Sequence, residues 1–137
     1  MLYLFRALGP IFAIATLLFD PTAVAAQQPE LMVRVSEIEI VSSYLDEYKA
    51  ILKEEAASSV RLEPGVIAIF PMYQKEHPTQ VRILEIYANR AAYESHLQTS
   101  HFQRYKTTTL RMVKSLKLVD MGVVDAETMS RIFRKAP

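Results

Sequence analysis

The chain has 137 residues, half of them hydrophobic, and its 16 basic and 15 acidic side chains leave a formal net charge of +1. That length suits one domain and excludes a multidomain machine, and the balanced charge gives no reason to expect a nucleic acid or an acidic lipid surface as partner. Without cysteine there is no disulfide, thiol nucleophile or thiolate metal site, and three widely spaced glycines cannot form a glycine-rich phosphate loop.

The N-terminal segment, residues 1–25, has the pattern of a secretory signal peptide. One basic residue, Arg6, precedes the apolar run of residues 7–19, and small residues follow at Ala23 and Ala25. The run is shorter than the roughly 20 residues that span a bilayer, which favours cleavage over the alternative of an uncleaved anchor. We therefore expect an exported protein, in a bacterial periplasm, with no stable membrane association after cleavage.

The next segments predict a strand followed by a helix. Residues 31–40 are rich in β-branched side chains that partly alternate with polar ones. Ser42 or Ser43 can cap a helix, and apolar residues then recur at spacings of three and four as far as about Ser59. This apolar stripe consists of Leu45, Tyr48, Leu52 and Ala56.

A strand hairpin is predicted after this helix. Residues 63–65, Glu-Pro-Gly, are typical of a turn, in which glycine supplies a positive φ if the turn is type II. Residues 66–73 are apolar and β-branched, residues 75–79 suit a hairpin loop, and residues 81–87 alternate in the manner of a third strand.

The residues from Asn89 onward predict a broken helix and a final strand. Asn89 is a natural N-cap for a helix that breaks near residues 99–100 and then restarts. Residues 116–124 predict the fourth strand, and residues 125–137 predict a short helical tail capped at Asp125.

The element order over residues 31–124 is β-α-β-β-α-β. This order is typical of a ferredoxin-like α+β fold, an antiparallel sheet with its helices on one face. Strands two and three carry apolar residues on both faces, so the bare face of the sheet is expected to meet a second copy of the chain. We therefore expect a homodimer whose two sheets pack face to face as a dimeric α+β barrel.

The candidate site lies in residues 84–105. Glu85 on the third strand and His96 on the following helix are expected to meet between sheet and helix, where such a pair can relay a proton. Nearby rings can hold a flat apolar substrate, and they comprise Tyr87, Tyr93, Phe102 and Tyr105. Alternatives stay open, because helical rings often form core and a lone histidine is often a satisfied buried group.

A metal site is not expected from the spacing of the histidines. His96 and His101 are five positions apart, whereas side chains on one helix face are three or four apart. The chain has no H-E-x-x-H motif and no G-x-S-x-G motif. An enzyme with this sequence would supply a pocket and acid–base groups to a substrate that brings its own reactivity.

In these residues the chain resembles the antibiotic biosynthesis monooxygenase domain family, particularly its small quinol monooxygenase-like members. The resemblance covers Met32 to about Met121 and is carried, in order, by Glu63-Pro64-Gly65-Val66, Glu85-x-Tyr87, Ala91-Ala92-Tyr93-x-x-His96 and His101-Phe102. It implies a dimeric barrel with a pocket between each sheet and its own helices. It also implies oxidation of a quinol or related electron-rich aromatic with O₂, using neither metal nor organic cofactor.

The resemblance also implies roles for the matching residues. Glu85 and His96 would handle protons, Tyr87 and His101 would make polar contacts to the substrate, and the pocket wall would be formed by Tyr93, Phe102 and Tyr105. Haem-degrading relatives use a first-strand asparagine and a tryptophan, neither of which this chain has, so haem chemistry is disfavoured. The alternative function is a noncatalytic dimeric module of the same fold that binds a small ligand.

Overall fold

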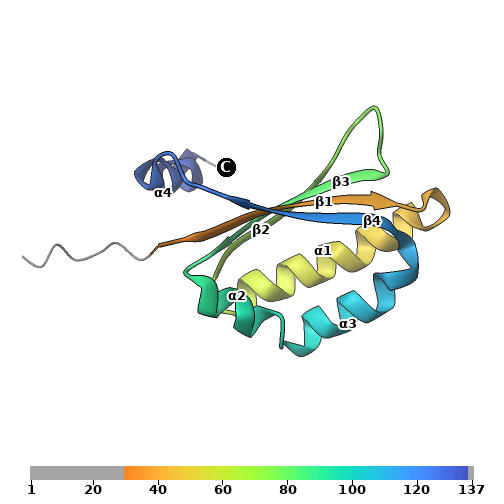
Figure 1. The fold of residues 1–137 in the computed structure, drawn as a ribbon, viewed down its shortest axis with the longest axis horizontal. Helices are drawn as coiled ribbons and strands as arrows, with labels where there is room; N and C mark the ends of the chain where they lie inside the picture. The colour runs from red at the N-terminus through yellow and green to blue at the C-terminus, as the bar shows by residue number, and fades with distance from the viewer. Residues whose placement is uncertain (1–29, 136–137) are drawn as a thin grey trace, which may run out of the picture.

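The computed structural model describes residues 30–135, in which four strands form one antiparallel sheet of order β2-β3-β1-β4 (Figure 1). The strands are β1 (Met32–Ile40), β2 (Val66–Tyr73), β3 (Gln80–Tyr87) and β4 (Val113–Met121). This order is that of the predicted ferredoxin-like α+β fold. The predicted signal peptide, residues 1–25, lies outside the described residues.

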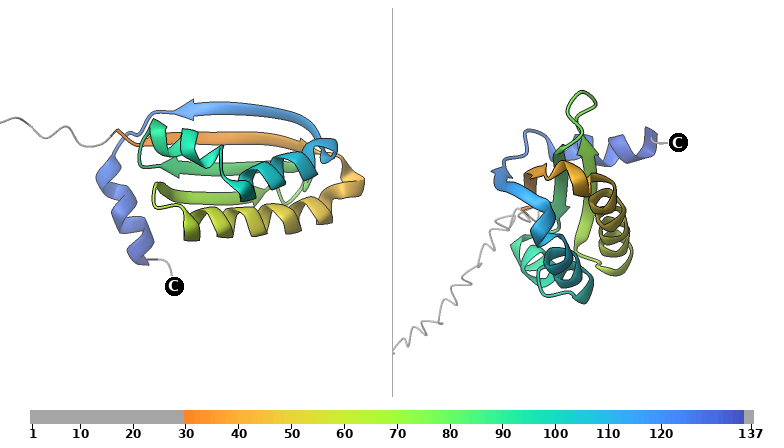
Figure 2. Two further views of the ribbon diagram at one scale, coloured as in Figure 1. Left: turned by 90° about the horizontal axis from the view of Figure 1, so that it is seen from below. Right: turned by 90° about the vertical axis from the view of Figure 1, so that its right-hand side faces the viewer.

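Helices α1, α2 and α3 cover one face of the sheet, and α4 lies at the end of the sheet, away from them (Figures 1 and 2). Their bounds are α1 (Leu45–Leu62), α2 (Arg90–His96), α3 (Ser100–Thr109) and α4 (Ala126–Lys135). Within residues 30–135, no helix combines the length and the apolar character needed to cross a bilayer. The broken helix is confirmed as α2 and α3.

Side-chain caps start the later helices but not the first. Asn89 accepts a hydrogen bond from the backbone N–H of Ala92 at 2.9 Å, and Asp125 caps α4. The predicted cap at Ser42 or Ser43 is wrong, because both serines lie in a single 3-10 turn and α1 begins after it without a side-chain cap. Burial of the apolar stripe of α1 stabilises this helix in place of a cap.

The core lies between α1 and the central strands. Alternate residues of β1 are buried toward the helices, namely Met32, Arg34, Ser36, Ile38 and Ile40. The buried face of α1 consists of Tyr48, Leu52, Glu55, Ala56 and Ser59. The predicted stripe of this helix is thus confirmed, except that it also contains a carboxyl group and a hydroxyl group.

The fourth strand occupies different residues from those predicted. The structure places β4 at Val113–Met121, three residues before the predicted range of 116–124 at each end. Its pairing with β1 sets these ends, since Val113 pairs with Ile40 and Met121 pairs with Val33. Val123 and Val124 look like strand residues, but β1 has no residues left to pair with them.

Gly65 is required by packing and not by its backbone angles. No glycine among the described residues has a positive φ, so Gly65 does not supply the positive φ that a type II turn would need. A Cβ atom built on Gly65 would instead lie 2.5 Å from the Cβ of Ala92. Glycine therefore lets α2 approach the start of β2 closely, and α2 carries His96.

Apolar residues gather on the face of the sheet opposite α1, α2 and α3. Strand register places on it Val33, Val35, Phe70, Leu84, Ile86, Val119 and Met121, which we call the far face. Phe70 is 59% exposed and Met121 is 47% exposed. Contiguous apolar surface of this kind is typical of an interaction site.

Candidate functional site

A cavity of about 430 Å³ lies between the helix-covered face of the sheet and helices α2 and α3. This volume is in the range of small-molecule sites. Residues that line it from the sheet include Arg34, Ser36, Ile69, Ile83, Glu85 and Leu118, and those that line it from the helices include Glu55, Tyr93, His96, Phe102, Tyr105 and Thr109. The surface that these residues present to the cavity is mainly apolar, with polar groups set into it.

Glu85 is held in place on the sheet side of the cavity by two hydroxyl groups. Ser36 Oγ donates to Glu85 Oε1 at 2.5 Å, and Tyr87 Oη donates to Glu85 Oε2 at 2.8 Å. Ser36 comes from β1, which pairs with β3, so strand register brings the first of these groups together. The carboxylate is therefore oriented before any ligand binds.

Tyr87 lies behind Glu85 and does not line the cavity. Its side chain is fully buried, and burial together with the neighbouring Glu85 carboxylate raises the pKa of the Tyr87 phenol far above its ordinary value. The phenol therefore stays protonated and acts as a hydrogen-bond donor to Glu85. The polar contact that was predicted between Tyr87 and a substrate would have to pass through Glu85.

His96 lies on the helix side of the cavity and is only 3% exposed. Its Nδ1 is 3.0 and 3.2 Å from the two carboxylate oxygens of Glu63. Its Nε2 is 3.8 Å from Glu55 Oε1. Since a carboxylate accepts, Nδ1 carries a proton in this arrangement, and Glu63 sets both the tautomer and the orientation of the ring.

Glu63 also contacts the second histidine, His101, whose Nε2 is 2.6 Å from Glu63 Oε1. The break between α2 and α3 turns the chain, so two histidines five positions apart meet one carboxylate. Burial alone would raise the pKa of Glu63, but the hydrogen bonds from His96 and His101 outweigh it and hold this pKa below its usual value. Neither Glu63 nor His101 lines the cavity.

Glu55 is a buried carboxyl group that the sequence prediction missed. It lines the cavity, and its Oε1 accepts a hydrogen bond from Ser59 Oγ at 2.7 Å. Burial raises the pKa of Glu55. The signal that could have found it is its spacing, three residues after Leu52 and four before Ser59 on the buried face of α1.

The aromatic residues form one wall of the cavity. The ring of Phe102 is 4.7 Å from that of His96 and 6.1 Å from that of Tyr105, measured between centroids. The hydroxyl of Tyr105 is 2.7 Å from that of Tyr48, and burial raises the pKa of Tyr48 to about 12. Phe102 and Tyr105 thus present ring surface to a ligand, as does Tyr93, which lines the same cavity.

Arg34 places a fixed cation at the edge of the cavity. Its Nε and Nη2 donate to Asp120 Oδ1 at 2.8 and 2.6 Å, and its guanidinium carbon lies 4.4 Å from the ring centroid of Tyr93. The sequence prediction missed this residue too. The sequence did hold a signal for it, because Arg34 stands at one of the alternate positions of β1 whose side chains point toward the helices.

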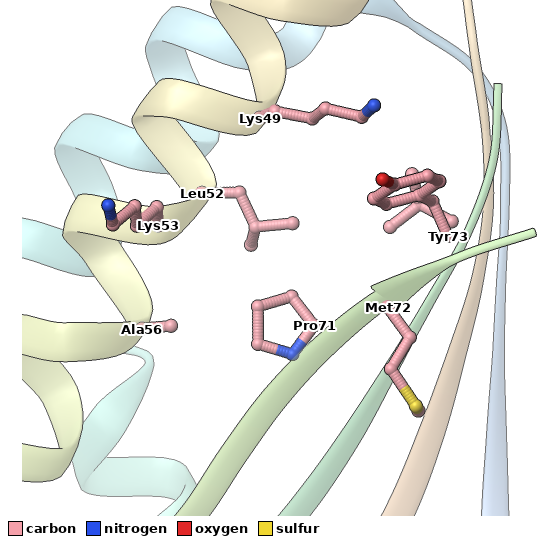
Figure 3. Close-up of a pocket in the computed structure, with 8 residues that line it drawn as sticks. Lys49, Leu52, Lys53, Ala56, Pro71, Met72 and Tyr73 are labelled. Atoms are coloured by element: carbon pink, nitrogen blue, oxygen red, sulfur yellow. The ribbon is translucent and has the colours of Figure 1, made fainter. Parts of the chain in front are cut away.

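A second cavity, of about 350 Å³, lies between α1 and β2 (Figure 3). Leu52, Ala56 and Pro71 line it, Lys49 and Lys53 stand on its helix side, and the Lys49 ammonium lies 3.8 Å from the ring centroid of Tyr73. None of the described residues that line it is a carboxylate or a histidine. The acid–base groups therefore belong to the first cavity.

The structure brings most of the predicted site together. Five predicted residues line the first cavity, namely Glu85, His96, Tyr93, Phe102 and Tyr105. The other two, Tyr87 and His101, lie behind it and contact Glu85 and Glu63 respectively. Polar residues of the site that the prediction did not include are Glu63, Glu55, Arg34 and Ser36.

Comparisons with known proteins agree on one family. Residues 32–108 match the model of the family described as antibiotic biosynthesis monooxygenase. A candidate antibiotic biosynthesis monooxygenase from Bacteroides thetaiotaomicron VPI-5482 has 50% identity and a TM-score of 0.69, over 70% of this chain and 91% of that chain. A candidate monooxygenase from Lactobacillus acidophilus NCFM has 26% identity and a TM-score of 0.67, over 69% of this chain and 45% of that one.

A third similar structure, a candidate antibiotic biosynthesis monooxygenase from Nitrosomonas europaea, has 20% identity and a TM-score of 0.67, over 72% of this chain and 95% of that chain. At this identity the likeness concerns the fold. None of the curated proteins matches the chain.

Proposed function

Since the chain belongs to the antibiotic biosynthesis monooxygenase family, we propose that it is a monooxygenase that oxidises a quinol or a related small electron-rich aromatic compound with O₂. We further propose that no metal or organic cofactor takes part in this reaction. The observation that supports both is the first cavity, in which a carboxylate on the sheet and an imidazole on the helix line one apolar space of about 430 Å³.

The substrate itself supplies the electrons in this reaction. A quinol that loses a proton becomes a strong reductant, and it can transfer electrons directly to O₂. One oxygen atom becomes a new ring hydroxyl, and the other leaves as water with two hydrogen atoms from the quinol, so that the product is a hydroxyquinone. The protein has to orient the ring, accept and return protons, and exclude bulk water.

The first proton transfer is assigned to Glu85. Ser36 and Tyr87 hold its carboxylate in a fixed position, and each oxygen keeps a further lone pair for a substrate hydroxyl. His96 is the second proton-transfer group, oriented by Glu63 through Nδ1. Tyr93, Phe102 and Tyr105 would pack against the faces and edges of the aromatic ring.

Oxygen uptake with reduced naphthoquinones tests this proposal. In the presence of a metal chelator, we expect uptake well above the rate of autoxidation, and label from ¹⁸O₂ in the hydroxyquinone. Uptake at the autoxidation rate, measured while the quinol is shown to bind, would exclude the reaction and favour the noncatalytic binding module.

We propose in addition that the protein is a homodimer that buries the far face. Opposite charges lie at one end of this face, where Glu37 pairs in register with Arg82 on one side and Lys117 on the other, so a second copy can set opposite charges against them. We expect light scattering at micromolar concentration to give twice the mass of one chain.

The variant Phe70→Lys is expected to convert this dimer into monomers, because it places a charge on an exposed apolar position of the far face. Val60→Lys is the matched control, since Val60 is 47% exposed but belongs to α1. A monomeric wild-type protein, or a Phe70→Lys variant that remains dimeric, would contradict the proposed interface.

A further inference from the structure

Glu63, His96 and His101 converge from three different elements behind the wall of the first cavity. Glu63 directly follows α1, His96 ends α2, and His101 lies in the first turn of α3. One carboxylate oxygen and one nitrogen of each imidazole all lie within 4.8 Å of one another. We infer that these three residues form a binding site for a divalent first-row transition-metal ion such as Zn²⁺. This inference goes beyond the proposed function and does not depend on it.

The distances within the cluster suit a shared ion. Glu63 Oε1 is 3.0 Å from His96 Nδ1 and 2.6 Å from His101 Nε2. Ligand atoms bound at about 2.0–2.2 Å to one ion are roughly 2.9–3.4 Å apart at octahedral or tetrahedral angles. The carboxylate oxygen thus lies near both imidazoles at close to this spacing, and all three ligand atoms lie within 4.8 Å of one another.

The hydrogen bonding of His96 gives an independent indication. His96 Nδ1 lies 3.0 Å from Glu63 Oε1, and its Nε2 lies 3.8 Å from Glu55 Oε1, so each ring nitrogen faces a carboxyl group. An ion bound to Nδ1 moves the proton to Nε2, which then points toward that carboxylate. Histidines that bind a metal through one nitrogen usually direct the other at a carboxylate, a carbonyl or water in this way.

The donor set of the cluster also favours a cation. Glu55 and Glu63 both lie next to His96, and within residues 30–135 their ion pairs are to histidines alone. The cluster therefore offers a cation one carboxylate oxygen and two imidazole nitrogens, with the carboxyl group of Glu55 beside them. Nitrogen donors select a transition metal over Mg²⁺ or Ca²⁺, both of which prefer oxygen ligands.

The five-residue spacing that argued against a metal is overcome by the helix break. Thr99 ends the turn after α2 and caps α3, so the two histidines lie on separate helices and both face Glu63. The side chains of Glu63 and His101 are each 12% exposed, so the site is not fully closed to an ion. The bound ion would join α1, α2 and α3 at this corner.

Metal titration of the tag-free chain, stripped with EDTA and desalted, tests the inference. We expect one Co²⁺ per chain with a visible absorption band, displaced by Zn²⁺ but not by millimolar Mg²⁺. His101→Gln and Glu63→Gln are each expected to lower Zn²⁺ affinity by at least 10–100-fold, the range for loss of a supporting residue at a metal site. His77→Gln is the matched control, because His77 lies in the exposed loop before β3 and should leave affinity unchanged.

Thermal unfolding distinguishes a variant that has lost metal binding from one that has failed to fold. Without metal, both glutamine variants should unfold cooperatively, and Zn²⁺ should raise the midpoint of the wild type but not of the variants. The absence of saturable binding at one equivalent would overturn the inference. Equal affinity in the wild type and both variants, or equal loss in His77→Gln, would overturn it as well. These measurements use no quinol, so they stand whether or not the chain has oxygenase activity.

Discussion

Replacing Glu85 with Gln is expected to lower kcat/KM for quinol-dependent oxygen uptake by about 10²–10⁴-fold, the usual contribution of a positioned general base. The amide has nearly the same shape as the carboxylate, but it cannot accept the first proton of the quinol. Its carbonyl oxygen can still accept a hydrogen bond from Ser36 or Tyr87, so the fold should persist. The measurement is the initial rate of oxygen uptake over a range of reduced naphthoquinone concentrations.

Glu76→Gln serves as the control for this experiment. Glu76 lies in the exposed loop between β2 and β3, so the same chemical change there should leave the rate unaltered. If Glu85→Gln retained the wild-type rate, Glu85 would not be the base, and the assignment would move to the other proton acceptors of the cavity, His96 and Glu55.

A second large effect is expected on stability from His96→Ala, which should lower the free energy of unfolding by about 3–5 kcal/mol, the range for leaving a buried carboxylate without its partner. His96 is the group that lies next to both Glu55 and Glu63. Without it the Glu55 side chain keeps, among the described residues, the hydrogen bond from Ser59, and a cavity opens beside Phe102. Urea denaturation in the presence of EDTA measures the change without any contribution from metal.

His77→Ala is the reference for this stability measurement, because His77 is exposed and should change the free energy of unfolding by less than about 0.5 kcal/mol. A loss below about 1 kcal/mol in His96→Ala would mean that both carboxylates find other partners. That result would contradict the role of His96 as the link between Glu55 and Glu63.

Local pattern was sufficient to predict most of the fold. The alternation in β1 and the apolar stripe of α1 are properties of neighbouring residues, and the structure confirms both. Asn89 likewise caps α2 through a backbone N–H three positions away. The ends of β4 were wrong because they depend on which residues of a distant strand remain free to pair.

The candidate site was only partly predictable, because its partners are far apart in the chain. Glu85 was predicted from the alternation along its strand, and His96 was predicted from the spacing of residues along its helix. Glu63 was noted in a turn and in a family motif, and it was given no role in the site. Its two histidines follow it by 33 and 38 positions, and they reach it only because the helix breaks between them. No pattern within one helix could have shown that contact.

The position of β1 at the centre of the sheet has a consequence for how the chain is made. During synthesis β1 emerges before every strand it pairs with, and only β2 and β3 form a local hairpin. Ser36 must wait for Glu85, 49 residues later, and Arg34 must wait for Asp120, 86 residues later. The sheet cannot close until β4 has left the ribosome, so β1 stays open to chaperones while the intervening residues are made, and closure is slower than the folding of a helical bundle of this size.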